Sequence, residues 1–195
     1  MIGLTGAIGV GKSSVLAAFA LRGCPVLSAD AIVHELYLQA SVRDQIVTHF
    51  GTEVLGADGK VDRSALARRC FDNGDALAWI ECLLHPLVAD LFDAWVAECA
   101  NAAPPPALVV YESPLLFEAG QTDRFDRVLV VIAPETTRRS RLAARGQLER
   151  APEREARLWS TERREAAADD LLDNAGTHEH LQKLVDGYIA RYANR

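Results

Sequence analysis

The sequence lacks the features that would place it in a membrane or on an export route. Its 195 residues contain no apolar run near the roughly 20 residues that a membrane-spanning helix needs. The first residues carry neither the basic segment nor the cleavage site of a signal peptide. We therefore expect a cytoplasmic protein without a membrane partner.

Cysteine is scarce and shows no paired spacing. The four cysteines, Cys24, Cys70, Cys82 and Cys99, form no Cys-x-x-Cys pair. This pattern argues against a zinc site or a disulfide framework and fits reduced thiols in the cytosol. The sequence also contains no internal repeat and no low-complexity segment.

Positive charge is limited as well. The sequence has 21 lysines and arginines against 27 acidic residues, and its formal net charge is −6. The totals therefore indicate no basic face for a nucleic acid. With 49% hydrophobic and 25% charged residues, the composition is that of a globular domain with a full core.

What the sequence does contain is a phosphate-binding loop close to its first residue. Residues Gly6–Ser13 read Gly-Ala-Ile-Gly-Val-Gly-Lys-Ser and match the pattern G-x-x-x-x-G-K-[ST]. In this motif, backbone N–H groups surround the phosphates, the lysine reaches the β- and γ-phosphates, and the following hydroxyl meets Mg²⁺. The apolar run 1–4 and the helical pattern 14–21 flank the loop as a strand and a helix. The sequence therefore predicts a bound nucleoside triphosphate, with Lys12 on phosphate and Ser13 on the metal.

Strands and helices alternate along the rest of the sequence. Further strand-like runs occur at 25–28, 108–112, 127–133 and 171–173. Such alternation predicts a parallel sheet with helices on both faces. Roughly 70 residues of helical pattern separate the second and third strands, which is far more than an ordinary crossover. We interpret this stretch as an inserted lobe for a second substrate, with a helix break at His85-Pro86.

Asp30 is the candidate proton acceptor. It follows the second strand, at the edge where open α/β sheets bind their ligands. A carboxylate there can take the proton of an acceptor hydroxyl as the bond to phosphorus forms. The alternative is the N-cap of a helix that starts at Ala31, because Asp is a favoured capping residue. The spacing alone does not separate these two roles.

Two further residues have a functional and a structural interpretation. Glu112 ends the third strand and could hold the metal through water, or it could be a buried charge without such a role. His85 precedes a proline at a helix junction, where it could contact a substrate or simply pack.

Arginines are concentrated in the helical pattern that follows the strand-like run 127–133. Arg138, Arg141 and Arg145 share one face of a predicted helix that Pro134 opens. A mobile lid that bears these arginines would neutralise phosphate charge and exclude water. The alternative is a solvated helix face. Trp159, in the charged segment that follows, could meet a base or cover the lid hinge.

Several spaced segments together resemble the dephospho-coenzyme A kinases. They include the loop, Ala-Asp before a helix, Leu-Leu-His-Pro-Leu, Pro-Leu-Leu-Phe-Glu and a final Asp-Asn-x-Gly. In chain order they are 4–13, 29–30, Arg63-x-x-Leu66 with Phe71, 83–87, 114–118 and 168–176. Their order and spacing hold over nearly the whole sequence.

The resemblance implies that ATP phosphorylates the ribose 3′-hydroxyl of dephospho-coenzyme A, the last step of coenzyme A synthesis. It implies a catalytic group formed by Asp30 as the base with Lys12, Arg141 and Arg145. The residues that it implies around ATP are Thr5, Gly6, Gly9, Val10, Gly11, Lys12, Ser13, Ser14, Asn174 and Gly176. Those that it implies around dephospho-coenzyme A are Asp30, Arg63, His85, Pro114, Leu115 and Leu116.

Pattern and resemblance together predict a P-loop NTPase fold of three α/β/α layers. It would have a five-stranded, mainly parallel sheet, a helical acceptor-binding insertion and an arginine-rich lid. We expect one P-loop kinase domain over 1–195, with its core at about 1–34, 104–138 and 166–195, the acceptor lobe at about 35–103 and the lid at about 139–165. We expect a monomer whose partner is the small molecule dephospho-coenzyme A.

The sequence departs from the family pattern at a few positions. Ser28 stands where the family usually has Asp, and Ala7 and Val10 stand where Gly and Ser are usual. A glutamine that is common in the lid has no clear counterpart.

These departures leave a catalytically impaired nucleotide-binding relative as one alternative. A nucleoside- or nucleotide-monophosphate kinase is another, because it shares the loop, lobe and lid. A GTP-dependent switch is disfavoured, since no Asn-Lys pair of a guanine motif exists.

Overall fold

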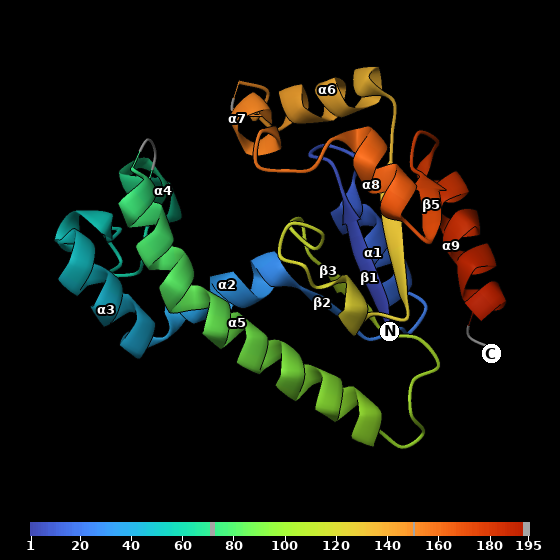
Figure 1. Ribbon diagram of the computed structural model, residues 1–195, viewed down its shortest axis with the longest axis horizontal. Coiled ribbons are helices and arrows are strands. Elements are labelled where there is room, and N and C mark those ends of the chain that lie inside the picture. Colours follow the sequence, from blue (N-terminus) through green and yellow to red (C-terminus); the bar gives the residue numbers. More distant parts are fainter. Residues whose placement is uncertain (71–72, 150, 193–195) are drawn as a thin grey trace. The chain divides into compact units, whose positions relative to one another are not determined.

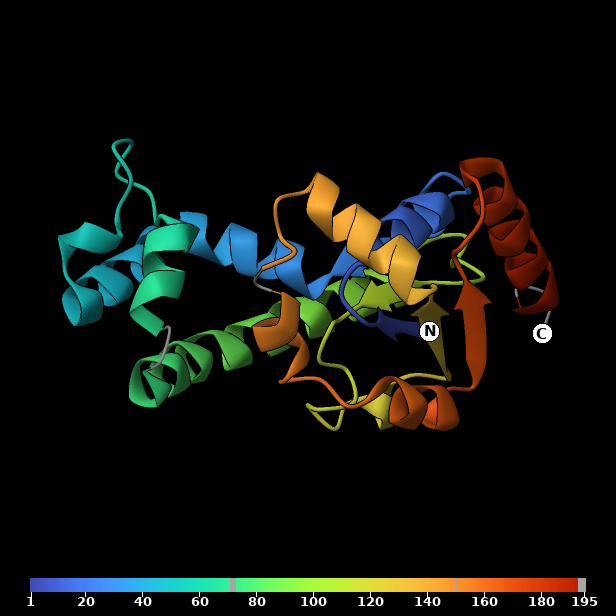
Figure 2. The ribbon, with the colours of Figure 1, turned by 90° about the horizontal axis from the view of Figure 1, so that it is seen from above.

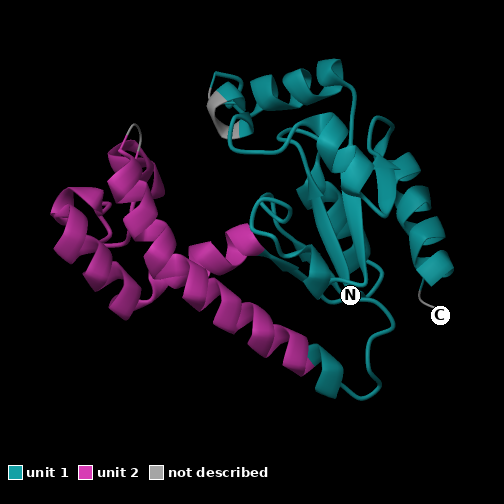
Figure 3. Ribbon diagram, viewed as in Figure 1, with its two compact units in different colours: residues 1–28, 99–195 teal, residues 29–98 magenta. Residues whose placement is uncertain are grey.

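The computed structural model describes residues 1–70, 73–149 and 151–192. Phe71, part of the acceptor-lobe resemblance, lies outside the described residues. The chain forms two compact units, one of residues 1–28 and 99–195 and one of residues 29–98 (Figure 3). We call them the sheet unit and the helical unit.

A parallel sheet of five strands organises the described part of the sheet unit (Figure 1). Its order is β2-β3-β1-β4-β5, and every pair of neighbours is parallel. The strands are β1 (Ile2–Gly6), β2 (Val26–Ser28), β3 (Val110–Glu112), β4 (Arg127–Ile132) and β5 (Asp170–Asp173). Because the carboxyl ends of parallel strands meet at one edge, the residues that follow β1 and β3 gather there. The predicted α/β fold class is confirmed.

One face of the sheet is covered by α1 (Lys12–Ala20) and α9 (His178–Tyr192), which contact each other. Apolar residues recur at helical spacing in both helices and pack against β1, β3, β4 and β5. Phe19 of α1 and Tyr188 of α9 meet edge to face, with 5.8 Å between ring centroids. This face holds the main hydrophobic core.

The opposite face carries a smaller core. Side chains of a strand alternate between faces, so Val128 and Val130 of β4 point away from α1. They pack with Leu116 and Phe117, and Trp159 lies against this cluster. Figure 2, seen from above, places α8 (Thr161–Ala167) and α1 on opposite sides of the sheet. The predicted α/β/α layering is therefore present.

Three short helices follow β4 in the chain. They are α6 (Glu135–Ala144), α7 (Ala151–Glu155) and α8. Ser160 is the N-cap of α8, because its Oγ accepts a hydrogen bond from the N–H of Arg163 at 3.2 Å. A single-turn 3₁₀ helix, η2 (Thr122–Arg124), precedes β4.

The helical unit is built from α2 (Ala29–Leu38), α3 (Ala40–Phe50), α4 (Arg63–Cys70) and most of α5 (Gly74–Asn101). Between α3 and α4 lie the 3₁₀ turn η1 (Thr52–Val54) and a tight turn closed by an antiparallel bridge between Leu55 and Val61. Asp58 and Gly59 lie in this turn. None of the helices in the described part of the chain is long and apolar enough to cross a bilayer.

Helix α5 is continuous through Pro86, so the predicted break at His85-Pro86 is wrong. A proline inside a helix removes one hydrogen bond and crowds the preceding turn, at a cost of about 3 kcal/mol. Leu84 before it and Phe92 after it are buried, at 6% and 3% exposure. Packing on both sides of the proline offsets this cost. The rule that proline ends a helix considers only neighbours in the sequence and does not include such packing.

Candidate active site

The phosphate loop joins β1 to α1, the strand–loop–helix context that the motif requires. Gly11 is the N-cap of α1, with φ of 92° in the left-handed region. A Cβ at this position would overlap the side-chain nitrogen of Asn174, so the site requires glycine. The Gly11 carbonyl accepts the first helical bonds, from the N–H groups of Ser14 (3.0 Å) and Val15 (3.1 Å). The first N–H groups of a helix have no partner within it, and they form a natural seat for an anion.

Lys12 lies against the start of this loop. Its ammonium donates to the carbonyl oxygens of Gly6 at 3.0 Å and Ala7 at 3.3 Å. In this motif the lysine is the residue that reaches the β- and γ-phosphates. Ser13 is exposed in the first turn of α1.

Three side chains from distant segments hold the carbonyl groups of the loop. Arg138 of α6 donates from Nε to the Ile8 carbonyl at 3.0 Å. Arg141 and the buried Asn174 both donate to the Val10 carbonyl, at 2.9 and 2.8 Å. Arg141 also reaches the carbonyl of Asn174 at 2.8 Å, which links α6 to the segment after β5. The loop is thereby held in shape through its carbonyl groups.

This arrangement was only partly visible in the sequence. The structure brings Arg141 and Asn174 to the loop, as neighbours of its backbone. Arg145 is exposed at the C-cap of α6, and Gly176 is exposed after β5. Contacts of Arg141 and Arg145 with phosphate, and of Asn174 and Gly176 with adenine, stay predictions.

The ends of β1, β2 and β3 carry polar groups, of which Thr5 and Glu112 are buried and Ser28 is half-buried. Ser28 and Glu112 are partners in the register of β2 and β3, and the Ser28 hydroxyl donates to Glu112 Oε2 at 2.7 Å. The Glu112 side chain is only 6% exposed. Thr5, which is fully buried, donates from its hydroxyl to the carbonyl of Pro114 at 3.4 Å. The Ser28–Glu112 pair escaped the sequence reasoning, and strand register is the signal that would have found it.

The Pro114–Leu116 turn divides its side chains between solvent and core. Leu115 is 39% exposed, whereas Leu116 is fully buried in the smaller core. Leu115 and the half-buried Pro114 are therefore the members of this turn with surface open to solvent. Leu116 packs under them, with Val128 and Val130 of β4.

The candidate residues of the helical unit lie on helix surfaces. Asp30 is exposed in the first turn of α2, which starts at Ala29. The N-cap interpretation, which needs a helix that begins at Ala31, is therefore wrong. Arg63 is the exposed first residue of α4, and His85 is exposed on α5.

One neighbour of Arg63 was not anticipated. Burial raises the pKa of the Tyr37 hydroxyl on α2, and the positive charge of Arg63 acts in the opposite direction. Arg63 therefore lies close enough to Tyr37 for their charges to interact within the helical unit.

Comparison with known proteins agrees with the geometry. The family model described as dephospho-CoA kinase matches residues 1–180. The dephospho-CoA kinase of Methylococcus capsulatus is 37% identical over 196 residues, covering 99% of this chain and 96% of the relative. That of Coxiella burnetii is 40% identical over 199 residues, covering 98% and 96%.

Solved structures give the same picture. The crystal structure of TT1252 from Thermus thermophilus superposes with a TM-score of 0.81 at 34% identity, covering 97% of this chain and 96% of that one. The dephospho-CoA kinase from Campylobacter jejuni shares the fold, with a TM-score of 0.65 at 23% identity over 99% and 96% of the two chains. The chain belongs to the dephospho-CoA kinase family.

Proposed function

We propose that this chain transfers the γ-phosphoryl group of ATP to the ribose 3′-hydroxyl of dephospho-coenzyme A, which yields coenzyme A and ADP. The observation that carries the proposal is the phosphate loop, held by Arg138, Arg141 and Asn174 in a member of this kinase family. Curated relatives that match nearly the whole chain bear the name of this activity.

The donor half of the site binds ATP in this proposal. The phosphates lie on the N–H groups of the loop, from Gly9 to Ser13, and Lys12 compensates their charge. Asn174 and Gly176 lie near the adenine, and Arg141 and Arg145 close over the phosphates as part of a lid at about 139–165. Phosphoryl transfer needs positioning and charge neutralisation more than covalent chemistry, and these groups supply both.

Ser13 in the first turn of α1 and Glu112 at the end of β3 fit Mg²⁺. This ion prefers oxygen ligands and keeps several of its waters. The exposed hydroxyl of Ser13 suits direct coordination, and the buried carboxylate of Glu112, oriented by Ser28, suits a water-mediated contact. Held by Ser13 and, through water, by Glu112, Mg²⁺ would neutralise the negative charge that develops on the phosphates.

The acceptor half centres on Asp30. As the ribose 3′-oxygen bonds to the γ-phosphorus, the bond from that phosphorus to ADP breaks, and the 3′-hydroxyl proton passes to a carboxylate oxygen of Asp30. Asp30 follows β2 after one residue, so the strand end fixes its place in the chain. Arg63, His85, Pro114 and Leu115 hold dephospho-coenzyme A, in a lobe at about 35–103 and at the turn after β3. We further propose a cytoplasmic monomer.

A coupled assay of ADP release tests this function directly. The full chain is incubated with ATP, Mg²⁺ and either dephospho-coenzyme A or a panel of nucleosides and nucleoside monophosphates, and products are identified by mass spectrometry. We expect turnover with dephospho-coenzyme A and formation of coenzyme A. The Lys12→Ala variant serves as the inactive control. Phosphorylation of a nucleoside monophosphate in its place would contradict the proposal.

A further inference from the structure

Arg164 is a buried cation with spare hydrogen-bonding capacity. It belongs to α8 and is only 4% exposed. Its Nη1 is buried and has no hydrogen-bond partner among the described residues. A buried charged donor without a partner is costly, and native proteins keep few of them. Such a group calls for an explanation from function.

Nearby charges act on the guanidinium of Arg164, but none of them provides a hydrogen-bond acceptor for Nη1. Burial is the strongest influence and lowers the pKa of its guanidinium, the Glu118 carboxylate raises it, and Arg138 lowers it. An arginine remains protonated in spite of such shifts. Glu118 itself accepts a hydrogen bond at Oε1 from the backbone N–H of Trp159, whereas its Oε2, like Arg164 Nη1, is buried without a hydrogen-bond partner among the described residues. Glu118 therefore compensates the charge of Arg164 while its own geometry is set by another segment.

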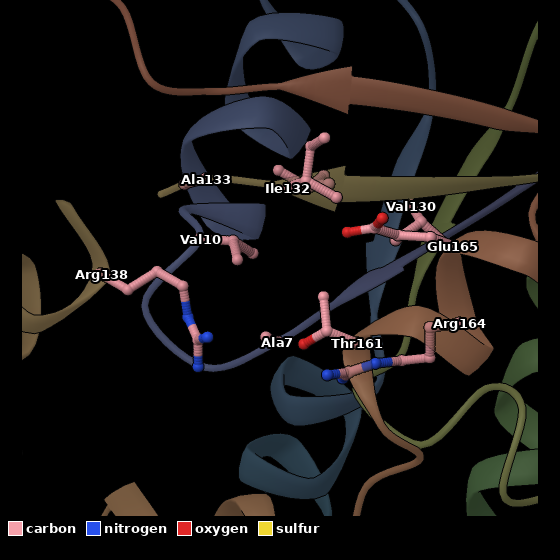
Figure 4. A pocket seen from close by; sticks show the side chains of 10 residues that line it. Ala7, Val10, Val130, Ile132, Ala133, Arg138, Thr161, Arg164 and Glu165 are labelled. Carbon is pink, nitrogen blue, oxygen red and sulfur yellow. The ribbon is translucent and has the colours of Figure 1, made fainter. Parts of the chain in front are cut away.

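The side chain of Arg164 reaches a small hollow beside the phosphate loop (Figure 4). The loop contributes Ala7 and Val10, α6 contributes Arg138, and α8 contributes Thr161 and Glu165 besides Arg164. In Figure 4 the guanidinium groups of Arg138 and Arg164 approach the region of Ala7 from different sides. All of these residues belong to the sheet unit.

The size of the hollow limits what it can take. Its volume is about 30 Å³, enough for one or two waters or for an oxygen of a larger group, and far too small for a nucleoside. Two cations and one carboxylate line it, and its remaining lining residues are apolar apart from Thr161. An oxygen that carries negative charge fits this environment.

Arg138 and Arg141 both bond to carbonyl groups of the loop. Arg138 bonds to the Ile8 carbonyl and pairs with Glu135 and Glu155. Arg141 divides its donors between two backbone carbonyls. Among the side chains near the loop that the structure describes, Arg164 is the arginine with a buried nitrogen that lacks a hydrogen-bond partner.

We infer that Arg164 binds a non-bridging oxygen of the terminal phosphate of ATP, through the hollow beside Ala7. The position follows from Lys12, whose ammonium lies 3.3 Å from the Ala7 carbonyl and whose role in this motif is to reach the β- and γ-phosphates. The inference rests on the proposed function, because it assumes that ATP occupies the phosphate loop. If so, Arg164 strengthens the binding of ATP but not of ADP, because ADP has no γ-phosphate to contact it.

The test compares Arg164→Met with Arg163→Met. Arg163 is the adjacent arginine, exposed and placed with its guanidinium carbon 3.4 Å from the centroid of the Trp159 ring. ATP and ADP affinities are measured by calorimetric titration of the full chain with Mg²⁺. We expect Arg164→Met to weaken ATP binding by about 10-fold or more, as for a lost hydrogen bond to a charged group, and to change ADP binding less than about 2-fold. Arg163→Met should change neither, and Arg164→Lys should recover part of the ATP affinity.

Removing Arg164 also leaves Glu118 without its compensating charge, which can unfold the chain. The double variant Glu118→Gln/Arg164→Met avoids this, and thermal unfolding identifies the variants that fold. Equal losses for ATP and ADP, or no loss for ATP, would overturn the inference and show a structural role only. If that happens while the wild type still phosphorylates dephospho-coenzyme A, the proposed function stands. If the wild type binds neither nucleotide, the proposed function fails first.

Discussion

The candidate residues of the two units are held in different ways. In the sheet unit, Lys12, Arg141 and the buried Asn174 all bond to backbone carbonyls of the phosphate loop. In the helical unit, Asp30 and His85 are exposed on helices. Substitution in the first group therefore alters the loop as well as its contacts with a ligand. Substitution in the second group leaves no buried partner unsatisfied, so it should change activity while stability stays the same.

The largest effect is expected from Lys12→Ala. The change removes the cation that meets the phosphates, and we expect kcat/KM for ATP to fall roughly 10³-fold, with weaker ATP binding. It also removes the bonds to the Gly6 and Ala7 carbonyls, so the melting temperature should fall slightly. Steady-state kinetics, nucleotide titration and thermal unfolding measure the three quantities. Lys60→Ala, at an exposed lysine paired with Asp58, is the control. Unchanged ATP binding in Lys12→Ala would contradict the proposal that the phosphate loop binds ATP.

Asp30→Asn should have the second largest effect. It keeps the size of the side chain but removes the proton acceptor, so kcat should fall roughly 10²-fold or more while ATP affinity stays close to that of the wild type. Because Asp30 is exposed, the melting temperature should not change. Asp44→Asn on α3 provides a control at another exposed aspartate. Near-normal turnover would take Asp30 out of the mechanism, and a clear loss of stability would break the contrast between the units.

Asn174→Ala should show the opposite profile. It deletes the buried hydrogen bond from the Asn174 side chain to the Val10 carbonyl. We therefore expect the free energy of unfolding to fall by about 1–3 kcal/mol. Because the loop then loses part of its support, ATP affinity should fall several-fold with it. Denaturant unfolding and titration report the two changes. Asn101→Ala, at an exposed residue near the end of α5, should leave both unchanged. Full stability in Asn174→Ala would show that the loop keeps its shape without this residue.

His85→Ala is expected to give the smallest effect. The loss of one exposed acceptor contact should raise KM for dephospho-coenzyme A by roughly 3- to 10-fold, with kcat and the melting temperature unchanged. His178→Ala, at an exposed histidine of α9, is the matched control. An unchanged KM would exclude His85 from the acceptor site.

The sequence predicted the features that depend on local pattern. Residues that are close together in the chain determine the phosphate loop with its strand and helix. The same is true of the alternation of strands and helices that produces a parallel sheet. Local rules failed where packing decides. Helix α5 continues through Pro86, and α2 starts at Ala29 rather than at Ala31.

Contacts between distant segments were the part that could not be predicted. Arg138 and Arg141 share a helix face, as their spacing indicates, but the carbonyls that they bind lie 130 and 131 residues earlier in the chain. Ser28 and Glu112 meet across 84 residues, through the register of two strands. Arg164 lies in a segment rich in arginine, where composition does not distinguish a buried side chain from its exposed neighbours.

The support of the phosphate loop through its carbonyl groups has a thermodynamic consequence for nucleotide binding. Ordering a flexible backbone costs roughly 1–2 kcal/mol of conformational entropy per residue, and a loop that orders only on binding loses that much affinity. Here Arg138, Arg141 and Asn174 restrict the loop when the chain folds. The entropy is thus lost before the ligand arrives. Association should then be governed by the encounter with nucleotide and not by a rearrangement of the loop.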